Sequence, residues 1–517
     1  MPWPPVYREL ALTEIIQQAI AANLSSLSLA MPEIIVTLGI LVIVTVDLIV
    51  TENKKVLMTA LTVVTLLAAL FSVVSLYDQP PQSLFAGMLS LDPFGLFFKL
   101  LVIVTTLVVV VFGLQSSDID HKYAEFYSVF LTVVLGGFLM ASATNLLMMY
   151  LALELVSLPS FILVGYQKYL RRSNEAALKY VVYGGVSSGI MLYGFSLIYG
   201  LTGTLDIHAV GARLASGEVP DLTLFLAATL AMAGFGYKVA SVPFHFWCPD
   251  VYQGAPTPVT AFLSVAPKGV GFAMLARFFY LGLSSFDGTS GEVLGGQWPE
   301  LLAVIAAATM TLGNLTAIWQ NNLKRLLAYS SIAHAGYMMM GVVMLSQAGL
   351  QAIMFYTAVY LFMNLGAFFV VILMAERTGS EDISEYRGLG WRSPFIAAAM
   401  AIFLASLTGL PPTAGFIGKI YLFAAVVEGG LWWLAVVGVL NSAVSLYYYW
   451  RIVRTMYLED PEDTSPITFP TFANVSLGIL LAGTLIFGLY FTPLADLTHA
   501  STSLHIPSAE VVEAILK

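Results

Sequence analysis

Pro93-Phe-Gly-Leu-Phe-Phe-Lys-Leu-Leu-Val-Ile-Val-Thr-Thr-Leu-Val-Val-Val-Val-Phe-Gly-Leu114 is the stretch that decides the fold class of this chain. It contains a single charged residue, Lys99, and as a helix it is long enough to cross a bilayer, which takes about 20 residues. Similar apolar runs recur along the chain. Their positions are near 33–50, 55–76, 93–114, 124–142, 144–166, 175–200, 221–242, 258–283, 299–318, 325–345, 350–375, 394–428, 430–456 and 473–492. These runs predict an all-α integral membrane protein of fourteen transmembrane helices, because lipid cannot satisfy free backbone groups and the runs are too long for barrel strands.

The composition agrees with a membrane protein and excludes several classes of function. Hydrophobic residues make up 58% of the 517 residues and charged residues only 10%, whereas soluble domains carry about 25% charged residues. No basic tract suits nucleic acid, and no Gly-rich phosphate loop is present. The single cysteine, Cys248, cannot form an internal disulfide or a four-cysteine metal site. We therefore expect no cofactor and no metal in this chain, and we expect any redox chemistry to belong to another polypeptide.

Cations in the loops predict the orientation in the membrane. They concentrate in loops that follow odd-numbered helices, at Lys54, Lys55, Lys122, Lys168, Arg171, Arg172, Lys324, Arg325, Arg377, Arg387, Arg392, Arg451 and Arg454. The loops after even-numbered helices hold little besides Arg213. Because cytoplasmic loops are enriched in Lys and Arg, this asymmetry places both termini on the non-cytoplasmic side.

Two of the predicted helices are interrupted by proline. Ala240-Ser-Val-Pro-Phe-His245 breaks the seventh run, and Gly409-Leu-Pro-Pro-Thr413 breaks the twelfth. Proline removes a helix donor and clashes with the preceding turn, so each site is either a simple kink or a discontinuous helix lining a polar cavity. Each break falls in the fourth member of a set of five helices, which favours two inverted repeats.

This pattern divides the chain into six segments. They are an N-terminal tail (1–32, with a short amphipathic helix at 10–22), three transmembrane helices (33–123), a first five-helix repeat (124–283), a second five-helix repeat (299–456), a last helix (473–492) and a C-terminal tail (493–517).

Four charged residues lie deep inside predicted spans, namely Glu154, Lys238, Lys268 and Lys419. A charge at mid-bilayer costs about 2.5–3.5 kcal/mol even on the mildest scale, so each position needs a reason. Structural ion pairing and snorkelling to the interface are the simple explanations. Proton transfer is the functional one: a buried lysine can lose its proton near neutral pH, which arginine cannot do.

Three further residues are candidates for an auxiliary relay. His245 lies within the first break, His334 lies mid-span, and Lys179 lies toward the cytoplasmic end of its helix. Histidine titrates near neutral pH, which suits a relay. A hydrogen-bonded packing role remains an equal alternative for the histidines, and snorkelling an equal alternative for Lys179.

Long motifs connect these residues to a known family. The first is Lys238-Val-Ala-Ser-Val-Pro-Phe-His-Phe-Trp-Cys-Pro-Asp-Val-Tyr-Gln-Gly-Ala-Pro-Thr-Pro-Val-Thr-Ala-Phe-Leu-Ser-Val-Ala-Pro-Lys268. The others are Asn322-Leu-Lys-Arg-Leu-Leu-Ala-Tyr-Ser-Ser-Ile-Ala-His-Ala-Gly-Tyr337 and Gly409-Leu-Pro-Pro-Thr-Ala-Gly-Phe-Ile-Gly-Lys419. They resemble the antiporter-like membrane subunits of respiratory complex I, in the form found in subunit N (subunit 2), and the resemblance covers about residues 30–490.

The resemblance implies a proton-translocating subunit of NADH-quinone oxidoreductase, with the redox centres in other subunits. It implies a glutamate–lysine pair, a central lysine and a terminal lysine, which map onto Glu154 with Lys238, then Lys268, then Lys419. It also implies antiporter-like subunit M and small subunits of the K and J type as partners. A bacterial inner membrane is expected, with a thylakoid location also open. Two alternatives remain: a subunit of a Mrp-type cation/proton antiporter, and a structural membrane subunit without its own proton path.

Overall fold

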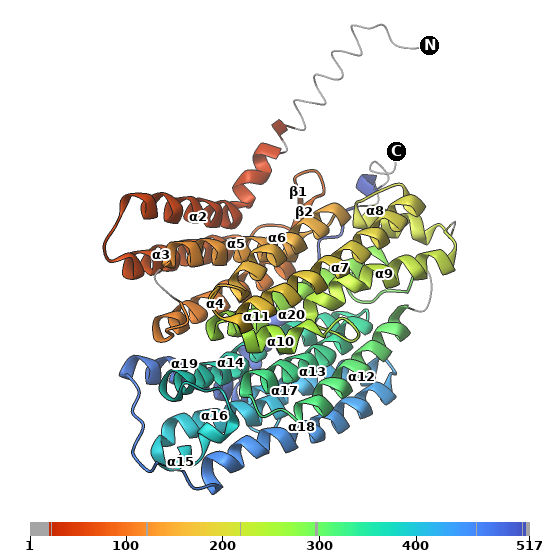
Figure 1. The fold of residues 1–517 in the computed structure, drawn as a ribbon. Helices are drawn as coiled ribbons and strands as arrows, with labels where there is room; N and C mark the ends of the chain where they lie inside the picture. The colour runs from red at the N-terminus through yellow and green to blue at the C-terminus, as the bar shows by residue number, and fades with distance from the viewer. Residues whose placement is uncertain are drawn as a thin grey trace, which may run out of the picture.

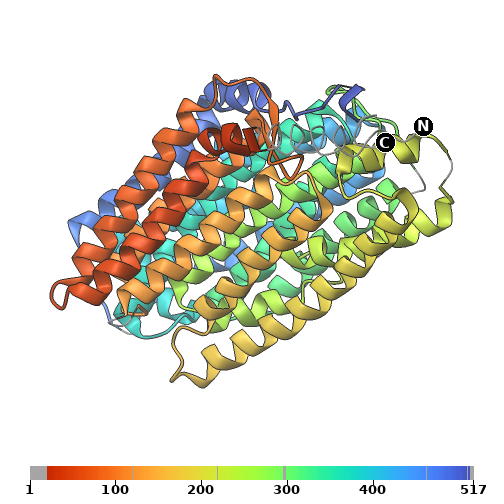
Figure 2. The ribbon, with the colours of Figure 1, turned by 90° about the horizontal axis from the view of Figure 1, so that it is seen from above.

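The structure is a computed structural model, which describes residues 20–512 except 22, 120, 121, 218, 295–297, 462 and 509. Most of this part of the chain is helical, and long helices run side by side (Figure 1). Viewed from above, the helices of both halves share a common tilt (Figure 2). The predicted amphipathic helix at 10–22 falls almost wholly outside the described residues, while residues 23–29 of the predicted tail are helical.

In the described part of the first half, one small hairpin and ten helices follow the helical residues 23–29. These elements are α2 Met31–Ile49, α3 Lys54–Ser75, β1 Gln82–Leu84, β2 Leu89–Leu91, α4 Pro93–Gln115, α5 Tyr123–Ser142, α6 Leu146–Val164, α7 Arg171–Thr202, α8 Ile207–Ala215, α9 Asp221–Val239, α10 Trp247–Gly254 and α11 Thr257–Arg277, which continues as the π-helix η1 Phe278–Gly282. The second half consists of α12 Trp298–Ala317, α13 Leu323–Val343, α14 Gln347–Thr378, the 3₁₀ helix η2 Ile383–Tyr386, α15 Leu389–Arg392, α16 Pro394–Thr408, α17 Ala414–Glu428, α18 Trp432–Leu458, α19 Thr471–Leu489 and α20 Thr492–Ala500. The last of these lies in the predicted C-terminal tail.

Twelve helices of the described chain are long and apolar enough to cross a membrane, which confirms an all-α integral membrane protein. The predicted count of fourteen also includes the broken pair α16–α17 and the helix α18. These do not meet the same criterion, because α16 and α17 have 15 residues each and α18 is less apolar. The count of fourteen, the six segments and the inverted repeats therefore stay predictions.

Both predicted breaks are confirmed. Helix α9 ends at Val239, and Ala240 takes the left-handed conformation (φ 61°) before α10 begins at Trp247. Helix α16 ends at Thr408, and Gly409 (φ 91°) turns the chain before α17 begins at Ala414. The prolines explain why neither helix continues, since proline cannot donate the next hydrogen bond.

Loops that carry predicted cytoplasmic cations meet at one end of the bundle. Arg172, the second residue of α7, forms an ion pair with Glu381 (2.6 Å) in the loop after α14. Ser117, after α4, donates its backbone N–H to Glu376 (2.6 Å) near the end of α14. The predicted orientation requires the loops after odd-numbered helices to lie at the same end of the bundle, and these contacts agree with that. The side of the membrane that this end faces stays a prediction.

Burial separates inner helices from outer ones. Every residue in the apolar window of α11 is buried, and 94% of the α13 window is buried. Only 28% of the apolar window is buried in α2 and in α19, so these two helices lie on the outside of the bundle. The inner helices α11 and α13 carry Lys268 and His334, so the fold itself places these residues in the interior.

Candidate functional site

Lys238 and Glu154 lie on neighbouring elements of the first half. Lys238, in the last turn of α9, is buried, and its Nζ donates to Ser157 Oγ on α6 (3.0 Å). Glu154 lies three residues before Ser157 on the same helix and is half-buried, close enough for its charge to act on the lysine. No ion pair of 4.0 Å or less joins the two within the described chain. The structure thus brings the predicted pair near each other, with the Ser157 hydroxyl as the direct contact of the amine.

A glycine on α11 lets Lys238 approach the central lysine. A Cβ added to Gly271 would lie 3.2 Å from Lys238 Cγ and 3.1 Å from Val239 Cγ1. Gly271 is three residues after Lys268, so it lies about one turn along the same helix. The stem of Lys238 therefore packs against α11 one turn from Lys268.

Lys268 is buried where α10, α11 and α13 meet. Its Nζ donates to Ser331 Oγ on α13 (2.6 Å) and lies 3.9 Å from Cys248 Sγ on α10. The amine also faces the ring of Tyr252, at 5.4 Å from the ring centroid. No carboxylate pairs with Lys268 in the described part of the chain, so polar neutral groups and an aromatic face surround it.

His245 occupies the first break, as predicted. It is buried, and its carbonyl oxygen accepts the backbone N–H of Cys248 (2.9 Å). Its Nδ1 has no hydrogen-bond partner among the described residues. His245 thus lies three residues before the cysteine that contacts Lys268.

His334 lies in the interior of α13 between two tyrosines. Its Nδ1 is 2.7 Å from Tyr356 Oη on α14, and its Nε2 is 3.4 Å from Tyr449 Oη on α18. The Tyr449 hydroxyl also shares a short hydrogen bond with Ser330. Both ring nitrogens of His334 therefore face hydroxyl groups, which can donate or accept a proton.

Lys419 bridges the second break. Its Nζ donates to the carbonyl oxygen of Thr408 (2.7 Å), the last residue of α16, and to Ser442 Oγ on α18 (3.0 Å). The amine lies 4.5 Å from the centroid of the Tyr337 ring, and Tyr337 Oη is 3.1 Å from the same Ser442 hydroxyl. The cation is thereby held by a helix C-terminal carbonyl, where the helix dipole favours positive charge.

Lys179 lies apart from this series. It is half-exposed near the start of α7 and forms ion pairs with Asp250 (2.7 Å) and Glu175 (2.9 Å). Asp250 in turn pairs with Arg325. These contacts suit a surface network better than a relay, and the auxiliary role of Lys179 stays a prediction.

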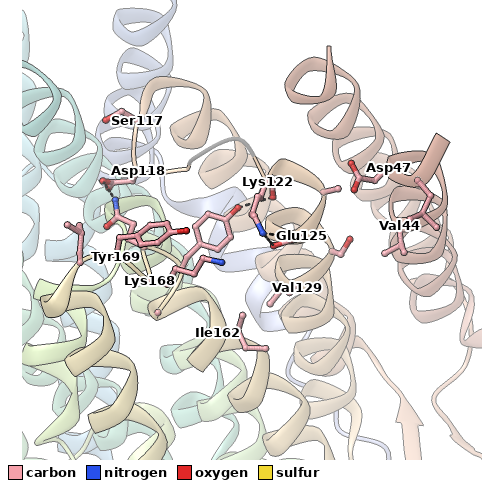
Figure 3. Close-up of a pocket in the computed structure, with 17 residues that line it drawn as sticks. Val44, Asp47, Ser117, Asp118, Lys122, Glu125, Val129, Ile162, Lys168 and Tyr169 are labelled. Carbon is pink, nitrogen blue, oxygen red and sulfur yellow. Dashed lines mark hydrogen bonds and ion pairs between the residues drawn. The ribbon is translucent and has the colours of Figure 1, made fainter. Parts of the chain in front are cut away.

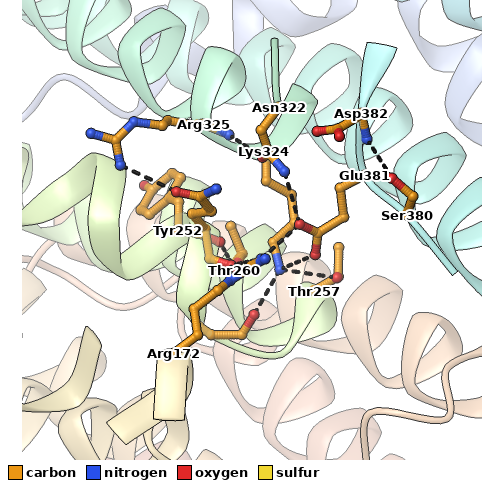
Figure 4. Close-up of polar contacts among 12 residues, drawn as sticks. Arg172, Tyr252, Thr257, Thr260, Asn322, Lys324, Arg325, Ser380, Glu381 and Asp382 are labelled. Atoms are coloured by element: carbon orange, nitrogen blue, oxygen red, sulfur yellow. Dashed lines mark hydrogen bonds and ion pairs between the residues drawn. The ribbon is translucent and has the colours of Figure 1, made fainter. Parts of the chain in front are cut away.

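Sequence reasoning missed Lys324, which was assigned to a loop. It is the second residue of α13 and is buried, with Nζ donating to the carbonyl of Ala255 (2.7 Å) and to Thr257 Oγ1 (3.2 Å). Glu381 pairs with Lys324 (3.1 Å) and with Arg172 (2.6 Å) (Figure 4). Burial alone would raise the pKa of the Glu381 carboxyl, but Lys324 and Arg172 together hold it below its usual value. Only the packing of three distant segments could reveal this cluster.

The Glu381 cluster borders a polar cavity of about 630 Å³ at the same end of the bundle. Asp118, Arg172, Thr257 and Glu381 are among the residues that line it. Within the described residues, no group of three or more His, Cys, Asp or Glu side chains is arranged to hold a metal ion.

Comparisons with known proteins agree with this arrangement. A family model described as "NADH:quinone oxidoreductase/Mrp antiporter, TM" matches residues 143–445. NADH-quinone oxidoreductase subunit N 2 of Chloroherpeton thalassium is 48% identical over 497 residues, covering 95% of this chain and 97% of the relative. Subunit N of Anaeromyxobacter sp. is 48% identical over 505 residues, covering 93% and 98%.

Solved structures give the same result. A chain in respiratory complex I from Thermus thermophilus with bound aureothin is 32% identical, with a TM-score of 0.76, over 90% of this chain and 98% of that one. A chain of the Mrp complex from Dietzia sp. has a TM-score of 0.80 at 21% identity, over 95% and 100% of the two chains, and shows a shared fold. With subunits N matching over almost its whole length, this chain belongs to the subunit N family of antiporter-like membrane subunits of NADH-quinone oxidoreductase.

Proposed function

We propose that this chain translocates protons across the membrane as a subunit of NADH-quinone oxidoreductase, driven by quinone reduction in other subunits. Family membership supports the assignment. The observation that carries the mechanism is the polar face of α13. Ser331, His334 and Tyr337 recur there every three residues. Ser331 contacts Lys268, and Tyr337 contacts Ser442, which is a partner of Lys419.

The first step lies in the first half of the chain. A change in charge at the neighbouring subunit draws the Glu154 carboxylate away from Lys238, which favours loss of the Lys238 proton. The proton passes to Lys268 along the α11 turn that begins at Gly271, with His245 as an intermediate acceptor. Because Lys238 is neutral after it has passed its proton to Lys268, the transferred charge is buried at only one of the two lysines at a time.

The second step uses α13. A proton on Lys268 reaches Ser331, then the His334–tyrosine cluster, and then Lys419 through Tyr337 and Ser442. The hydroxyl groups of serine and tyrosine both donate and accept, so each is suited to pass a proton on. From Lys419 the proton leaves on the far side.

Uptake from the cytoplasmic side is supported by the polar cavity beside Glu381. From this cavity Thr257, Thr260 and Ser264 follow one face of α11 at spacings of three and four residues, ending at Lys268 four residues later. Asn364 on α14 donates to Ser264 Oγ (2.6 Å) and leaves its Oδ1 without a partner in the described chain. This series gives Lys268 a polar connection to one end of the bundle.

The proposal also includes the membrane, the orientation and the partner subunits. The relatives are bacterial, which supports a bacterial inner membrane, and the loop cations support a cytoplasmic position for the end that carries Arg172 and Lys324. Both termini then face the opposite side. Redox centres are assigned to other subunits, and antiporter-like and small membrane-arm subunits are the partners. No observation favours the Mrp-type alternative, because similarity to the Mrp chain extends only to the fold.

Lys268→Arg tests the central step. Arginine keeps the charge at this site but cannot release its proton at neutral pH. We expect NADH-driven proton transport by the intact complex in vesicles to fall at least about tenfold. Lys55→Arg, at the start of α3, is the matched control and should transport normally. Normal transport by Lys268→Arg would remove Lys268 from the path.

A further inference from the structure

A second cavity, of about 800 Å³, lies between α2, α5 and the loop that joins α6 to α7 (Figure 3). Its size is within the range typical of small-molecule sites. It lies at the same end of the bundle as Glu381, and Ser117 and Asp118 line both cavities, but the residues used below do not belong to the proposed proton path. Its lining combines an apolar floor and a polar rim, and the two parts call for different chemistry in a ligand.

The floor is built from apolar side chains that other parts of this chain leave uncovered. Leu48 on α2 is 83% exposed, Val44 on α2 is 46% exposed, and Ile162 on α6 is 59% exposed. Val129 on α5 lies between them in the groove (Figure 3). Because these residues belong to helices that can span a membrane, the floor continues into an apolar surface that no described residue covers. A ligand that fills it can carry hydrocarbon chains into the bilayer.

The rim offers charges of both signs. The Lys168 amine has no hydrogen bond or ion pair among the described residues, and it lies 5.8 Å from the centroid of the Tyr169 ring. Lys122 pairs loosely with Glu125 (3.1 Å), and both side chains are more than half exposed. Asp47, on α2 across the groove, is 31% exposed and pairs with Lys54. Tyrosine at this level is typical of the membrane–water interface.

We propose that this cavity binds a phospholipid whose headgroup carries both a phosphate and a primary ammonium, as in phosphatidylethanolamine. The phosphate accepts from the unpaired Lys168 amine, since charge-assisted contacts of this kind are strong. The ammonium donates to Glu125 or Asp47, and the acyl chains follow Val44 and Ile162 into the bilayer.

The acidic residues of the rim decide between lipid classes. A purely anionic lipid such as phosphatidylglycerol has hydroxyl groups but no cation in its headgroup. Nothing in that headgroup would offset the negative charges of Asp47 and Glu125. Phosphatidylcholine carries a quaternary ammonium, which cannot donate a hydrogen bond. Ethanolamine headgroups satisfy both signs of charge at once.

The test uses the complete, purified complex after a detergent wash that removes loosely held lipid. Bound lipids are then counted by native mass spectrometry during titration with phosphatidylethanolamine, phosphatidylglycerol or phosphatidylcholine. The variants are Lys168→Gln, which removes the phosphate partner, and Ile162→Trp, which fills the floor without changing charge. Arg454→Gln is the control, because Arg454 is an exposed cation near the end of α18 and does not line the cavity.

We expect wild type and Arg454→Gln to retain a phosphatidylethanolamine molecule that both cavity variants bind about tenfold more weakly. Equal retention by all four proteins would overturn the site. Stronger binding of phosphatidylglycerol or phosphatidylcholine than of phosphatidylethanolamine would overturn the headgroup assignment. A cross-link from Ile162→Cys to another polypeptide of the complex would show that a protein segment occupies the groove instead.

Discussion

Lys419 and Lys268 are buried without carboxylate partners in the described chain, and both are stabilised by neutral oxygen atoms and aromatic faces. Lys268 relies on the Ser331 hydroxyl and the Tyr252 ring, and Lys419 on the Thr408 carbonyl and the Tyr337 ring. A carboxylate within salt-bridge distance would fix each proton more firmly on its lysine. Neither amine is therefore held by a full negative charge within the described chain.

At the residue scale, the sequence predicts the charged members of the proposed path but not the neutral ones. Lys238, Lys268 and Lys419 could be predicted because an isolated charge stands out in an apolar run. Ser331, Tyr356 and Tyr449 gave no such signal, since serine and tyrosine are ordinary residues of transmembrane helices. Lys324 was hidden by its position next to a loop, where a lysine is usually solvated.

Glu381→Gln should destabilise the complex in a pH-dependent way. The pKa of Glu381 is lowered in the folded chain, so its carboxylate stabilises the fold above the ordinary glutamate pKa of about 4.3. That contribution is lost as the pH falls through the lowered value. Removing this partner leaves Lys324 buried with an unpaired charge, which costs roughly 3–5 kcal/mol at neutral pH.

Thermal unfolding of the purified complex between pH 7 and pH 4 checks this expectation. The difference in Tm between wild type and Glu381→Gln should be largest at pH 7 and shrink toward pH 4. Glu52→Gln, in the exposed α2–α3 loop, should match wild type throughout. A Tm difference that grows as the pH falls would have the wrong sign for this ion pair.

At the element scale, the two interrupted helices are the feature that proline and glycine made predictable. The breaks follow directly from residues that cannot continue a helix. What the sequence could not supply is the contact across the second break, where Lys419 reaches back to the last carbonyl of α16. That contact depends on how α17 is placed after the turn, which local propensity does not encode.

Gly409→Ala tests this contact with a well-matched control. Gly409 has φ 91°, and a Cβ there would lie 2.8 Å from Lys419 Cδ. Gly379, which ends α14, has φ 71° with nothing within 4 Å of an added Cβ. Alanine at either position should cost about 1 kcal/mol in backbone strain.

Only Gly409→Ala should also displace the lysine. We expect proton transport in vesicles, normalised to the amount of assembled complex, to fall in Gly409→Ala and to stay at the wild-type level in Gly379→Ala. Equal transport by the two variants would show that displacing Lys419 does not affect proton transport.

At the scale of the whole molecule, a buried ion pair at the end opposite Glu381 joins distant parts of the chain. Arg277, at the end of α11, pairs with Asp92, and both side chains are fully buried. Arg277 also donates to the carbonyl of Ala141 on α5 (2.7 Å), and Asp92 accepts the backbone N–H of His505 (3.0 Å). Burial opposes ionisation of Asp92, but Arg277 and the hydrogen bonds from the backbone N–H groups of Gly95 and His505 keep its pKa below the usual value. Four segments are thereby fixed at one point.

The sequence does not predict the partner of Arg277, because nothing in a linear pattern shows that a residue 185 positions away will be its neighbour. The same limit applies to the relative placement of α11 and α13, on which the whole relay depends. Hydropathy predicts the membrane spans, but only the tertiary packing shows which of them lie inside the bundle.

Asp92→Asn should lower the stability of the chain by roughly 3–5 kcal/mol, because it leaves the Arg277 charge buried and unpaired. The amount of assembled complex in membranes and its Tm report the loss. The double variant Asp92→Asn with Arg277→Met should recover most of the loss, since neither charge then remains and the amide oxygen of asparagine can still accept a backbone N–H. Asp47→Asn, which breaks a partly exposed pair, should cost less than about 1 kcal/mol. A double variant as unstable as Asp92→Asn would show that the pair is needed for more than charge balance.

Lys238→Ala in membrane vesicles tests the central claim most directly. Assembly of the complex, NADH-driven quinone reduction and acidification of the vesicle interior should be recorded on the same preparation. If Lys238 passes the proton onward, the complex assembles while quinone reduction and acidification both fall sharply, because the two processes are coupled. Normal assembly with normal quinone reduction and normal acidification would contradict the account and leave this subunit with a structural role or a path through other residues.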